Sequence, residues 1–489
     1  MPRSAKAAPK RAPAVPVPVS PSRAKPWLIP AISVALLIPC FWQSRIQAGD
    51  LSSHIYNTWL ARLISQGRAP GLTVAWQSTN VLFDLMLSAL FPLGAGAAQR
   101  IAVSITVLVF VWGAFAWAST VAGRRAWHVL PLIVMLAYGW VFRIGFFNFY
   151  LSLGLCFAAA AFACKRNWIP VALLLAIAWT AHALPVLWMA AMLAYAEAAR
   201  LTAENRRGVL LGGAAAVIVL VRLLLDRIWQ TQWFPMQVVK ATGLDQVVVF
   251  DDRYDIVMVG LLALWVIGLI YLVRDAGLRQ IGISAPLHWC ILTALGILIL
   301  PGWVKLPQYR HALAYIADRM ALAMGIAVCV LISTARARSY QYYVAALAAL
   351  VFFALLYKDE AALNATEDRV EAAVAQLPAG QRVVNGIGAP SLRVDPLAHM
   401  VDRACVGRCF SYGNYEPSTA QFRVRLTGES PLVVSTYDDS YKLQVGGYVV
   451  KPREVPLYQL VADSTGEVFV RELPAGRPIS MTIWNPLGR

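Results

Sequence analysis

The chain has 489 residues, of which 59% are hydrophobic and only 14% are charged, and its formal net charge is +17. Soluble domains usually carry about 25% charged and about 45–50% apolar residues, so an ordinary soluble enzyme and a disordered or fibrous protein are excluded. The composition predicts a polytopic α-helical membrane protein. In a membrane protein, an excess of Lys and Arg is explained by their preference for cytosolic loops. No nucleic-acid partner is therefore expected.

The N-terminal residues 1–26 are rich in Pro and Ala and contain six basic residues but no acidic one. We expect them to form a disordered cytosolic tail. The first apolar run, 27–42, is expected to stay as an uncleaved helix because no small-residue cleavage site follows it. A spanning helix needs about 17–25 residues, and eleven apolar runs, several of them short, are candidates: 27–42, 99–119, 127–140, 146–164, 168–180, 184–197, 209–225, 255–272, 287–301, 319–334 and 341–357.

A further apolar stretch, Val81–Leu93, contains Asp84, and its placement decides the topology. If it spanned the membrane and 168–197 formed one helix, two basic loops would lie outside, against the preference for basic residues in cytosolic loops. We therefore expect Val81–Leu93 to lie on the outer surface, and 168–197 to form two helices hinged at 181–183. All five short basic loops then lie inside, with eleven basic residues against three acidic ones. The chain would have about eleven spans, a cytosolic N-terminus and an outward C-terminus.

In this arrangement residues 27–357 form the transmembrane domain, and a long outer loop, 43–98, carries surface helices. Past this domain the composition becomes that of a soluble protein, and residues 358–489 are long enough for one outward-facing α+β domain. Cys405 and Cys409 lie in it. In an oxidising compartment these two cysteines are expected to form a short-loop disulfide, and a free pair is the alternative.

The outer loop opens with Asp50, directly after the first apolar run. Apolar residues then recur at the spacing of a helix, while His54 and Asn57 fall on its polar side. His54 lies one turn from Asp50 on the same face. A carboxylate at the membrane boundary can accept a proton from a hydroxyl acceptor, and a neighbouring His can orient it. The alternative is that Asp50 only caps the N-terminus of the helix.

A first span, an Asp immediately beyond it, an amphipathic helix and a second surface helix (79–93) resemble the GT-C superfamily. These integral-membrane glycosyltransferases use polyprenyl-phosphate sugars and include protein mannosyltransferases and the aminoarabinose transferase of lipid A. The resemblance covers residues 27–200 in layout. It implies a catalytic role for Asp50 and a polyprenyl-phosphate sugar as donor, and the helical spacing adds His54 as the orienting partner of Asp50. The resulting hypothesis is a glycosyltransferase of the bacterial inner membrane with a periplasmic C-terminal domain. It would move a sugar from an undecaprenyl-phosphate carrier to a periplasmic or lipid-linked acceptor, with Asp50 as general base.

The chain departs from the family pattern at two places. Asp50 is not part of a D-x-D or D-E pair, and the short outer loop at 142–145 has no second acid. Both departures disfavour a metal-dependent mechanism. No cofactor is predicted, and the need for a divalent metal stays open.

Several other polar residues expected near the outer surface are candidates for substrate binding. Asn57 and Asp84 lie in the first outer loop, and His182 lies at the hinge. Asn148 and Tyr150 lie at the start of the fourth span. Each also has a simpler interpretation. Aromatic residues are common at membrane interfaces regardless of ligand, and polar groups at such depth often hydrogen-bond within the protein.

Three cations, Lys305, Arg310 and Arg319, lie in or beside the outer loop at 302–318. Arg can hold a lipid phosphate through two parallel hydrogen bonds, and neutralising that phosphate favours departure of the sugar. Arg310 and Arg319 are the better candidates. The alternative is a local salt bridge that involves Asp318.

Two other functions remain open from the sequence. A transporter or flippase would place charged residues at mid-bilayer on broken helices, whereas here the polar residues gather at the outer surface. A non-catalytic member of the same fold, or an anchor for the C-terminal domain, is the other alternative. Membrane lipids are expected partners, and the sequence leaves the question of protein partners open.

Overall fold

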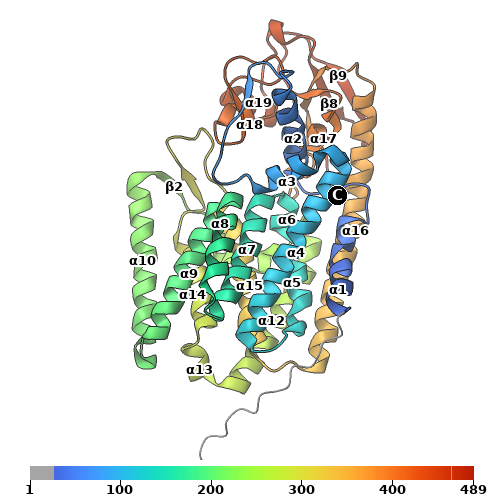
Figure 1. Cartoon of the computed structure of the whole chain (residues 1–489). Helices are drawn as coiled ribbons and strands as arrows, with labels where there is room; N and C mark the ends of the chain where they lie inside the picture. Colours follow the sequence, from blue (N-terminus) through green and yellow to red (C-terminus); the bar gives the residue numbers. More distant parts are fainter. Residues whose placement is uncertain (1–26, 464, 489) are drawn as a thin grey trace, which may run out of the picture.

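The structure is a computed structural model that describes residues 27–463 and 465–488. The tail that the sequence predicts to be disordered, residues 1–26, lies outside them. The described chain forms a bundle of helices that carries a smaller region with strands at one end (Figure 1). We call residues 376–488 the C-terminal region.

Eight helical segments in the described residues are long and apolar enough to cross a membrane. They are α4 (Ala95–Ala122), η3 to α6 (Trp127–Ile144), α7 (Phe147–Cys164), α9 (Ala183–Leu201), η4 to α10 (Glu204–Ile228), η6 to α12 (Asp252–Ala276), α15 (Ile316–Ser333) and α16 (Ser339–Ala375). The chain is therefore a polytopic helical protein. Three predicted spans are shorter apolar helices, so the total of about eleven stays a prediction: α1 with η1 (Leu28–Cys40), α8 (Trp168–Ala181) and α14 (Ala285–Ile299).

The stretch around Asp84 forms helix α3 (Leu82–Leu90). At 1.5 Å per residue its nine residues reach about 14 Å, less than half of the ~30 Å hydrocarbon core of a bilayer. With the 3-10 turn that follows it, α3 is one of the shorter apolar helices of the described chain (Leu82–Leu93), so its position on the outer surface stays a prediction. It lies at the same end of the bundle as the C-terminal region, together with α2 (Leu51–Ser65) (Figure 1).

The predicted interruption of 168–197 is confirmed, because α8 ends at Ala181 and α9 begins at Ala183. His182 between them has an extended backbone (φ −165°, ψ 130°), and its Nδ1 accepts a hydrogen bond from the Leu184 N–H. The Ser152 hydroxyl of α7 donates to the His182 carbonyl (2.8 Å). The break thus has its polar groups satisfied inside the bundle.

The basic loops meet one another at the end of the bundle that is farthest from the C-terminal region, where α13 (Leu278–Gly282) also lies (Figure 1). Arg124 donates to the carbonyls of Ser333 and Ala335. Arg338 lies 3.9 Å from Asp275, and Arg166 lies 3.6 Å from Glu197. These loops contain more basic than acidic residues, so an excess of positive charge lies at this end of the molecule.

Helix α16 continues without a break from the bundle into the C-terminal region. Its 37 residues correspond to about 56 Å. The predicted domain boundary at residue 358 consequently falls inside this helix. The same helix, α16, therefore belongs to the apolar bundle at its start and supports the C-terminal region at its end.

The C-terminal region is built on a mixed four-stranded sheet with the order β6-β4-β8-β9. Strand β4 (Arg382–Asn385) is parallel to β6 (Phe410–Ser411) and β8 (Tyr458–Ala462), and β9 (Val468–Glu472) is antiparallel to β8. The remaining elements are β5 (Ile387–Gly388), β10 (Thr482–Ile483), η7 (Pro452–Glu454), α17 (Met400–Cys405), α18 (Glu416–Thr419) and α19 (Tyr437–Val445).

The first loop and the C-terminal region form one layer over the bundle. Strand β1 (Leu72–Val74) pairs antiparallel with β7 (Val424–Leu426). A second short antiparallel pair is formed by β2 (Gln230–Gln232) and β3 (Trp303–Lys305), and the connection before α12 contains α11 (Gln237–Lys240) and η5 (Leu244–Val247). Buried apolar residues of the bundle and part of those of the C-terminal region form one continuous core, and a second, smaller cluster around Val384, Tyr412 and Leu457 lies within the C-terminal region.

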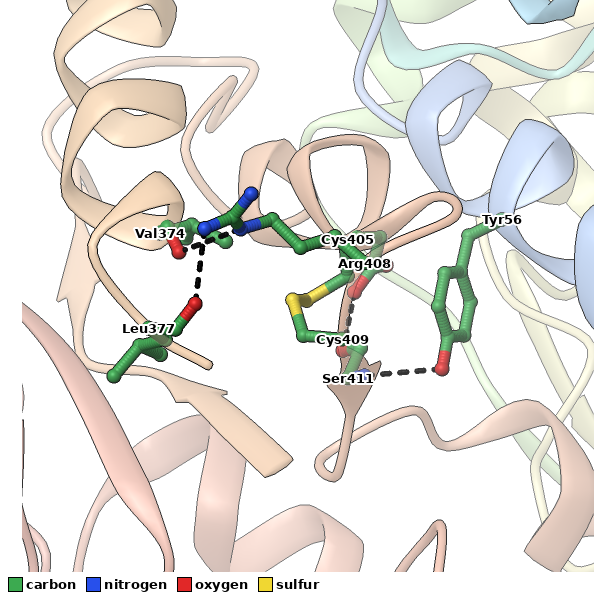
Figure 2. The surroundings of a disulfide bond; sticks show 8 residues. Tyr56, Val374, Leu377, Cys405, Arg408, Cys409 and Ser411 are labelled. Carbon is green, nitrogen blue, oxygen red and sulfur yellow. Dashed lines mark hydrogen bonds between the residues drawn. A yellow bond between two sulfur atoms is a disulfide. The ribbon is translucent and has the colours of Figure 1, made fainter. Parts of the chain in front are cut away.

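Cys405 and Cys409 form a disulfide at the end of α17, and both are fully buried. Figure 2 shows two sets of hydrogen bonds beside the disulfide. Arg408 donates to the Val374 and Leu377 carbonyls at the end of α16. The Ser411 N–H donates to the Tyr56 hydroxyl of α2 (3.0 Å). The disulfide segment therefore connects α16 to α2.

Candidate functional site

Asp50 is the residue that precedes α2, and its position is fixed through the backbone. Its N–H donates to the Ile144 carbonyl (2.9 Å), and the Gly49 N–H donates to the Arg143 carbonyl (2.8 Å). The Asp50 carboxylate forms no capping hydrogen bond to the helix, and the side chain is 29% exposed. Asp50 therefore occupies the position before the helix without making the capping hydrogen bond that the alternative requires.

The short loop that ends at Gly145 forms the floor under Asp50. Gly145 has φ +94°, and a Cβ added there would lie 2.6 Å from the Asp50 nitrogen and 3.0 Å from its Cβ. Only glycine combines this left-handed backbone with so close an approach. The loop without a second acid thus contributes backbone contacts to the site.

A buried ion pair fixes the chain that leads to Asp50. The Arg143 guanidinium lies 2.5 Å from Glu360, and both side chains are almost completely buried. Arg143 also donates to the Gln47 carbonyl (3.0 Å), and Trp42 donates to Glu360 (2.8 Å). Removal of one partner of such a pair leaves an uncompensated buried charge, which usually costs about 3–5 kcal/mol.

The histidine that faces Asp50 is His399, from the start of α17. Its Nε2 lies 3.8 Å from an Asp50 oxygen, and its Nδ1 lies 2.8 Å from Asp402. Burial opposes the charged imidazolium, but the hydrogen bond to Asp402 and the charges of Asp402 and Asp50 raise the pKa of His399 to about 9. His399 is thus a cation at neutral pH beside the Asp50 carboxylate.

Arg319 approaches the same site from the first turn of α15. Its guanidinium carbon lies 4.0 Å from the centre of the Phe146 ring, and one Nη lies 3.3 Å from the His182 Nε2. The buried Arg319 Nε has no hydrogen-bond partner among the described residues. Its charge interacts with that of Asp50. Arg319 therefore keeps donor capacity for an anion.

The loop before α15 lies against the C-terminal region over this site. The His311 and Tyr415 rings are 6.2 Å apart, and Tyr415 lies 6.0 Å from the His399 ring. The Lys305 ammonium donates to the Arg310 carbonyl, and the Arg310 side chain is exposed. We call Asp50, His311, Arg319, His399 and Tyr415 the Asp50 cluster.

His54 is paired with Asp84 and not with Asp50. Its Nδ1 lies 2.7 Å from one Asp84 oxygen, while Asn148 donates to the other (2.8 Å). Burial opposes the imidazolium, but the Asp84 charge and hydrogen bond raise the pKa of His54 to about 9. Burial also opposes ionisation of Asp84, yet the charge of His54 keeps its pKa below the ordinary value. The expectation that His54 orients Asp50 is corrected, because α3 packs on the polar side of α2 and presents Asp84 to the imidazole.

Two other predicted binding residues are occupied by protein contacts. Asn57 donates to Ser53 and accepts a hydrogen bond from Asn414 of the C-terminal region (2.8 Å). Tyr150 is fully buried and stacks on Phe110 with ring centres 4.2 Å apart. Asn57 thus joins α2 to the C-terminal region, and Tyr150 lies in the bundle core.

A polar pocket lies beside the Asp50 cluster, between α2, α3 and the C-terminal region. Its lining consists of His54, Asn57, Gln77, Asn80, Asp84, Glu416, Phe422, Arg423 and Val424. Burial raises the pKa of Glu416 to about 8, and the Asp84 and Asp50 charges add to this effect while His54 opposes it. Ser53 donates to Glu416 (3.2 Å).

Sequence reasoning missed His399, Asp402 and Glu416 as members of the site. The three-residue spacing of His399 and Asp402 favours a contact within one helical turn, which was the available signal. Nothing local in the sequence relates them to Asp50, about 350 positions away. No group of three or more His, Cys, Asp and Glu side chains in the described chain is placed to hold a metal ion.

Comparisons with protein-family models, curated proteins and solved structures find no match for this chain.

Proposed function

We propose that the protein is a membrane glycosyltransferase that moves a sugar from a polyprenyl-phosphate carrier to an acceptor hydroxyl. The observation that carries the proposal is the Asp50 carboxylate. It is partly exposed, makes no capping bond, and lies with Arg319 where the helical bundle meets the C-terminal region. A base for the acceptor and a cation for the phosphate are thus close together at the end of the apolar helices.

The reaction needs one base. Asp50 accepts the proton of the acceptor hydroxyl as the oxygen attacks the anomeric carbon of the donor. The bond between that carbon and the phosphate oxygen breaks, and the lipid phosphate leaves with the electron pair. Arg319 stabilises the charge that develops on this leaving group. His399 lies beside the Asp50 carboxylate, and Asp402 orients His399.

We place the C-terminal region outside the cytosol, on the periplasmic side of a bacterial inner membrane. The basic loops all lie at the opposite end of the bundle, and cytosolic loops are the ones that carry excess Lys and Arg. The donor would then bind from the outer leaflet, with its lipid chain in the bilayer and its phosphate near Arg319.

The test measures sugar transfer in vesicles that contain the full-length protein. A panel of radiolabelled polyprenyl-phosphate hexoses, pentoses and amino sugars is supplied with cell-envelope acceptors. Wild-type protein should transfer at least one of these sugars. Asp50→Asn should lower the rate by about 10²–10⁴-fold, the usual contribution of a general base.

The matched control is Asp438→Asn, which removes an exposed carboxylate on α19. It should leave the transfer rate unchanged. Equal thermal stability of the two variants would show that Asp50→Asn acts on the chemistry. Full activity of Asp50→Asn, or no transfer from any donor by the wild type, would contradict the proposal.

A further inference from the structure

Helix α16 carries a polar face in its second half. Its members recur at intervals of four, three and four residues, so they lie on one side of the helix. This face lies along the segment 42–47, which has no helix or strand and leads to Asp50. The contacts are Trp42 to Glu360 (2.8 Å), Ser44 to Asn364 (2.8 Å), Gln47 to Glu367 (2.7 Å) and Arg45 to Glu371 (2.9 Å).

Glu367 is the member of this face that binds two segments at once. Gln47 donates to its Oε2 (2.7 Å), and the Arg403 guanidinium of α17 donates to both of its oxygens (2.6 Å each). The Glu367 side chain is fully buried, and that of Arg403 is 7% exposed. A contact through two parallel hydrogen bonds fixes the orientation of the guanidinium as well as its distance. Glu367 therefore fixes α17 relative to the segment before Asp50.

Arg403 joins the same parts of the molecule through its remaining donors. Its Nη1 donates to the Ile46 carbonyl (3.1 Å) and to the side chain of Gln99 in α4 (2.9 Å). Gln99 is also buried. The Arg403 guanidinium thus contacts α16, α4 and the segment 42–47, and a displacement of α17 would break these hydrogen bonds together.

Both attachment points are close to the side chains that meet at the site. Gln47 precedes Asp50 by three residues, and Arg403 follows His399 by one helical turn. An Asp50 carboxylate oxygen and the His399 Nε2 are 3.8 Å apart. Only a few residues separate each attachment from its functional group, so the position of Glu367 sets how the two groups face each other.

The alternative is that the pair of Arg403 and Glu367 only stabilises the fold. A buried ion pair usually gives no more stability than apolar residues of similar size, because taking both charges out of water is costly. It does impose direction, since its hydrogen bonds need particular distances and angles. Positioning therefore accounts for the pair better than stability does.

We infer that Glu367 is a positioning residue, which places Asp50 and His399 opposite each other by binding the segments that carry them. The inference rests on the proposed function, which gives these two groups their roles. Glu367 takes no part in the proton transfer itself, because Arg403 and Gln47 occupy both of its oxygens.

The test measures how strongly Asp50 acts on His399 in the full-length protein in lipid vesicles. Magic-angle-spinning NMR follows the titration of the isotope-labelled histidines, and the His399 signal is the one that is lost in His399→Gln. In the wild type, Asp50→Asn should lower the pKa of His399 by about one pH unit, because an opposite charge this close favours the imidazolium. In Glu367→Gln, the same Asp50→Asn change should have less than half of that effect.

Other groups that act on His399 are the same in both backgrounds. They are Asp402 of α17 and Glu416 of α18, and the Tyr415 ring lies 6.0 Å away. Their influence cancels, because only the difference made by Asp50→Asn is compared. A role of Glu367 in stability alone would leave that difference unchanged.

A second variant decides the question if Glu367→Gln does not fold. Glu367→Met combined with Arg403→Met removes both buried charges, and exchanges of this kind often leave a protein as stable as before. This variant should also lose more than half of the effect of Asp50→Asn on His399. Failure of both variants to fold would assign Glu367 a role in stability and would overturn the inference.

The matched control is Glu371→Gln, which removes a partly exposed carboxylate one turn further along α16 that pairs with Arg45. It should keep the full effect of Asp50→Asn. A full effect in a folded Glu367 variant, an equal loss in the control, or no effect of Asp50→Asn in the wild type would also contradict the inference. The measurement uses neither donor nor acceptor, so an absence of sugar transfer would contradict only the proposed function.

Discussion

His399 shows how one side chain acquires its role from partners far away in the sequence. Asp402 lies in the same helical turn, whereas Asp50 comes from the other end of the chain. The two carboxylates keep the imidazole charged in a buried place. Burial alone would lower the pKa of a histidine. The hydrogen bond to Asp402 and the charges of Asp402 and Asp50 together outweigh that effect.

This coupling predicts a pH dependence of stability. The pKa of His399 is about 9 in the folded protein and about 6.5 in an unfolded chain. Its stabilisation is therefore fully present below pH 6.5 and is lost as the pH rises through 9. A shift of this size corresponds to about 3 kcal/mol. The melting temperature of the wild type should fall between pH 7 and pH 9.5, and that of Asp402→Asn should fall less.

The control for this experiment is Asp368→Asn, which removes an exposed partner of Arg45. It should keep the wild-type slope. His54 has a similar pKa of about 9. It therefore adds the same pH dependence to the melting temperatures of the wild type, Asp402→Asn and Asp368→Asn. Parallel curves for the wild type and Asp402→Asn would refute the assignment of the slope to His399.

At the scale of elements, the approach of the loop before α7 to the start of α2 is the critical packing contact. Gly145→Ala would impose both a left-handed backbone on a non-glycine residue and a clash with Asp50. Gly123→Ala imposes only the backbone strain, because no atom lies within 4 Å of its added Cβ and its φ is +66°. The two variants therefore separate strain from packing.

We expect Gly123→Ala to lower the free energy of unfolding by about 1 kcal/mol and Gly145→Ala by about 2–4 kcal/mol. The larger change should come with reduced sugar transfer, because Asp50 is displaced. Thermal unfolding of both variants in detergent, together with the transfer assay, measures this difference. Equal effects of the two substitutions would show that the close contact is unimportant.

At the scale of the whole molecule, the separation of charge predicts the orientation in the membrane. Asn205 lies among the basic loops and Glu472 lies in the C-terminal region, and both are exposed. With the exposed Cys164 replaced by Ser, a membrane-impermeant maleimide should label Glu472→Cys but not Asn205→Cys in sealed right-side-out vesicles. Permeabilisation should make both reactive.

The other free cysteines of the described chain are buried and should contribute little background, namely Cys40, Cys156, Cys290 and Cys329. Labelling of Asn205→Cys in sealed vesicles would reverse the proposed orientation. It would also place Asp50 on the cytosolic side.

The sequence by itself determined the class of the protein and the positions of its helices. Hydropathy and loop charge are local properties, so they located the eleven apolar segments, the break at 181–183 and the segregation of basic loops. The continuation of α16 past residue 358 was missed, because a change of composition marks where a helix leaves the apolar layer and not where it ends.

Only the tertiary structure decided which groups meet at the site. The sequence selected Asp50, but pairing it with His54 assumed that neighbours on one helix face act together. Helix α3 occupies that face, so Asp84 takes His54, and the folded C-terminal region supplies His399 to Asp50. Contacts of this kind depend on how distant elements pack, and packing is a property of the whole chain that no local pattern contains.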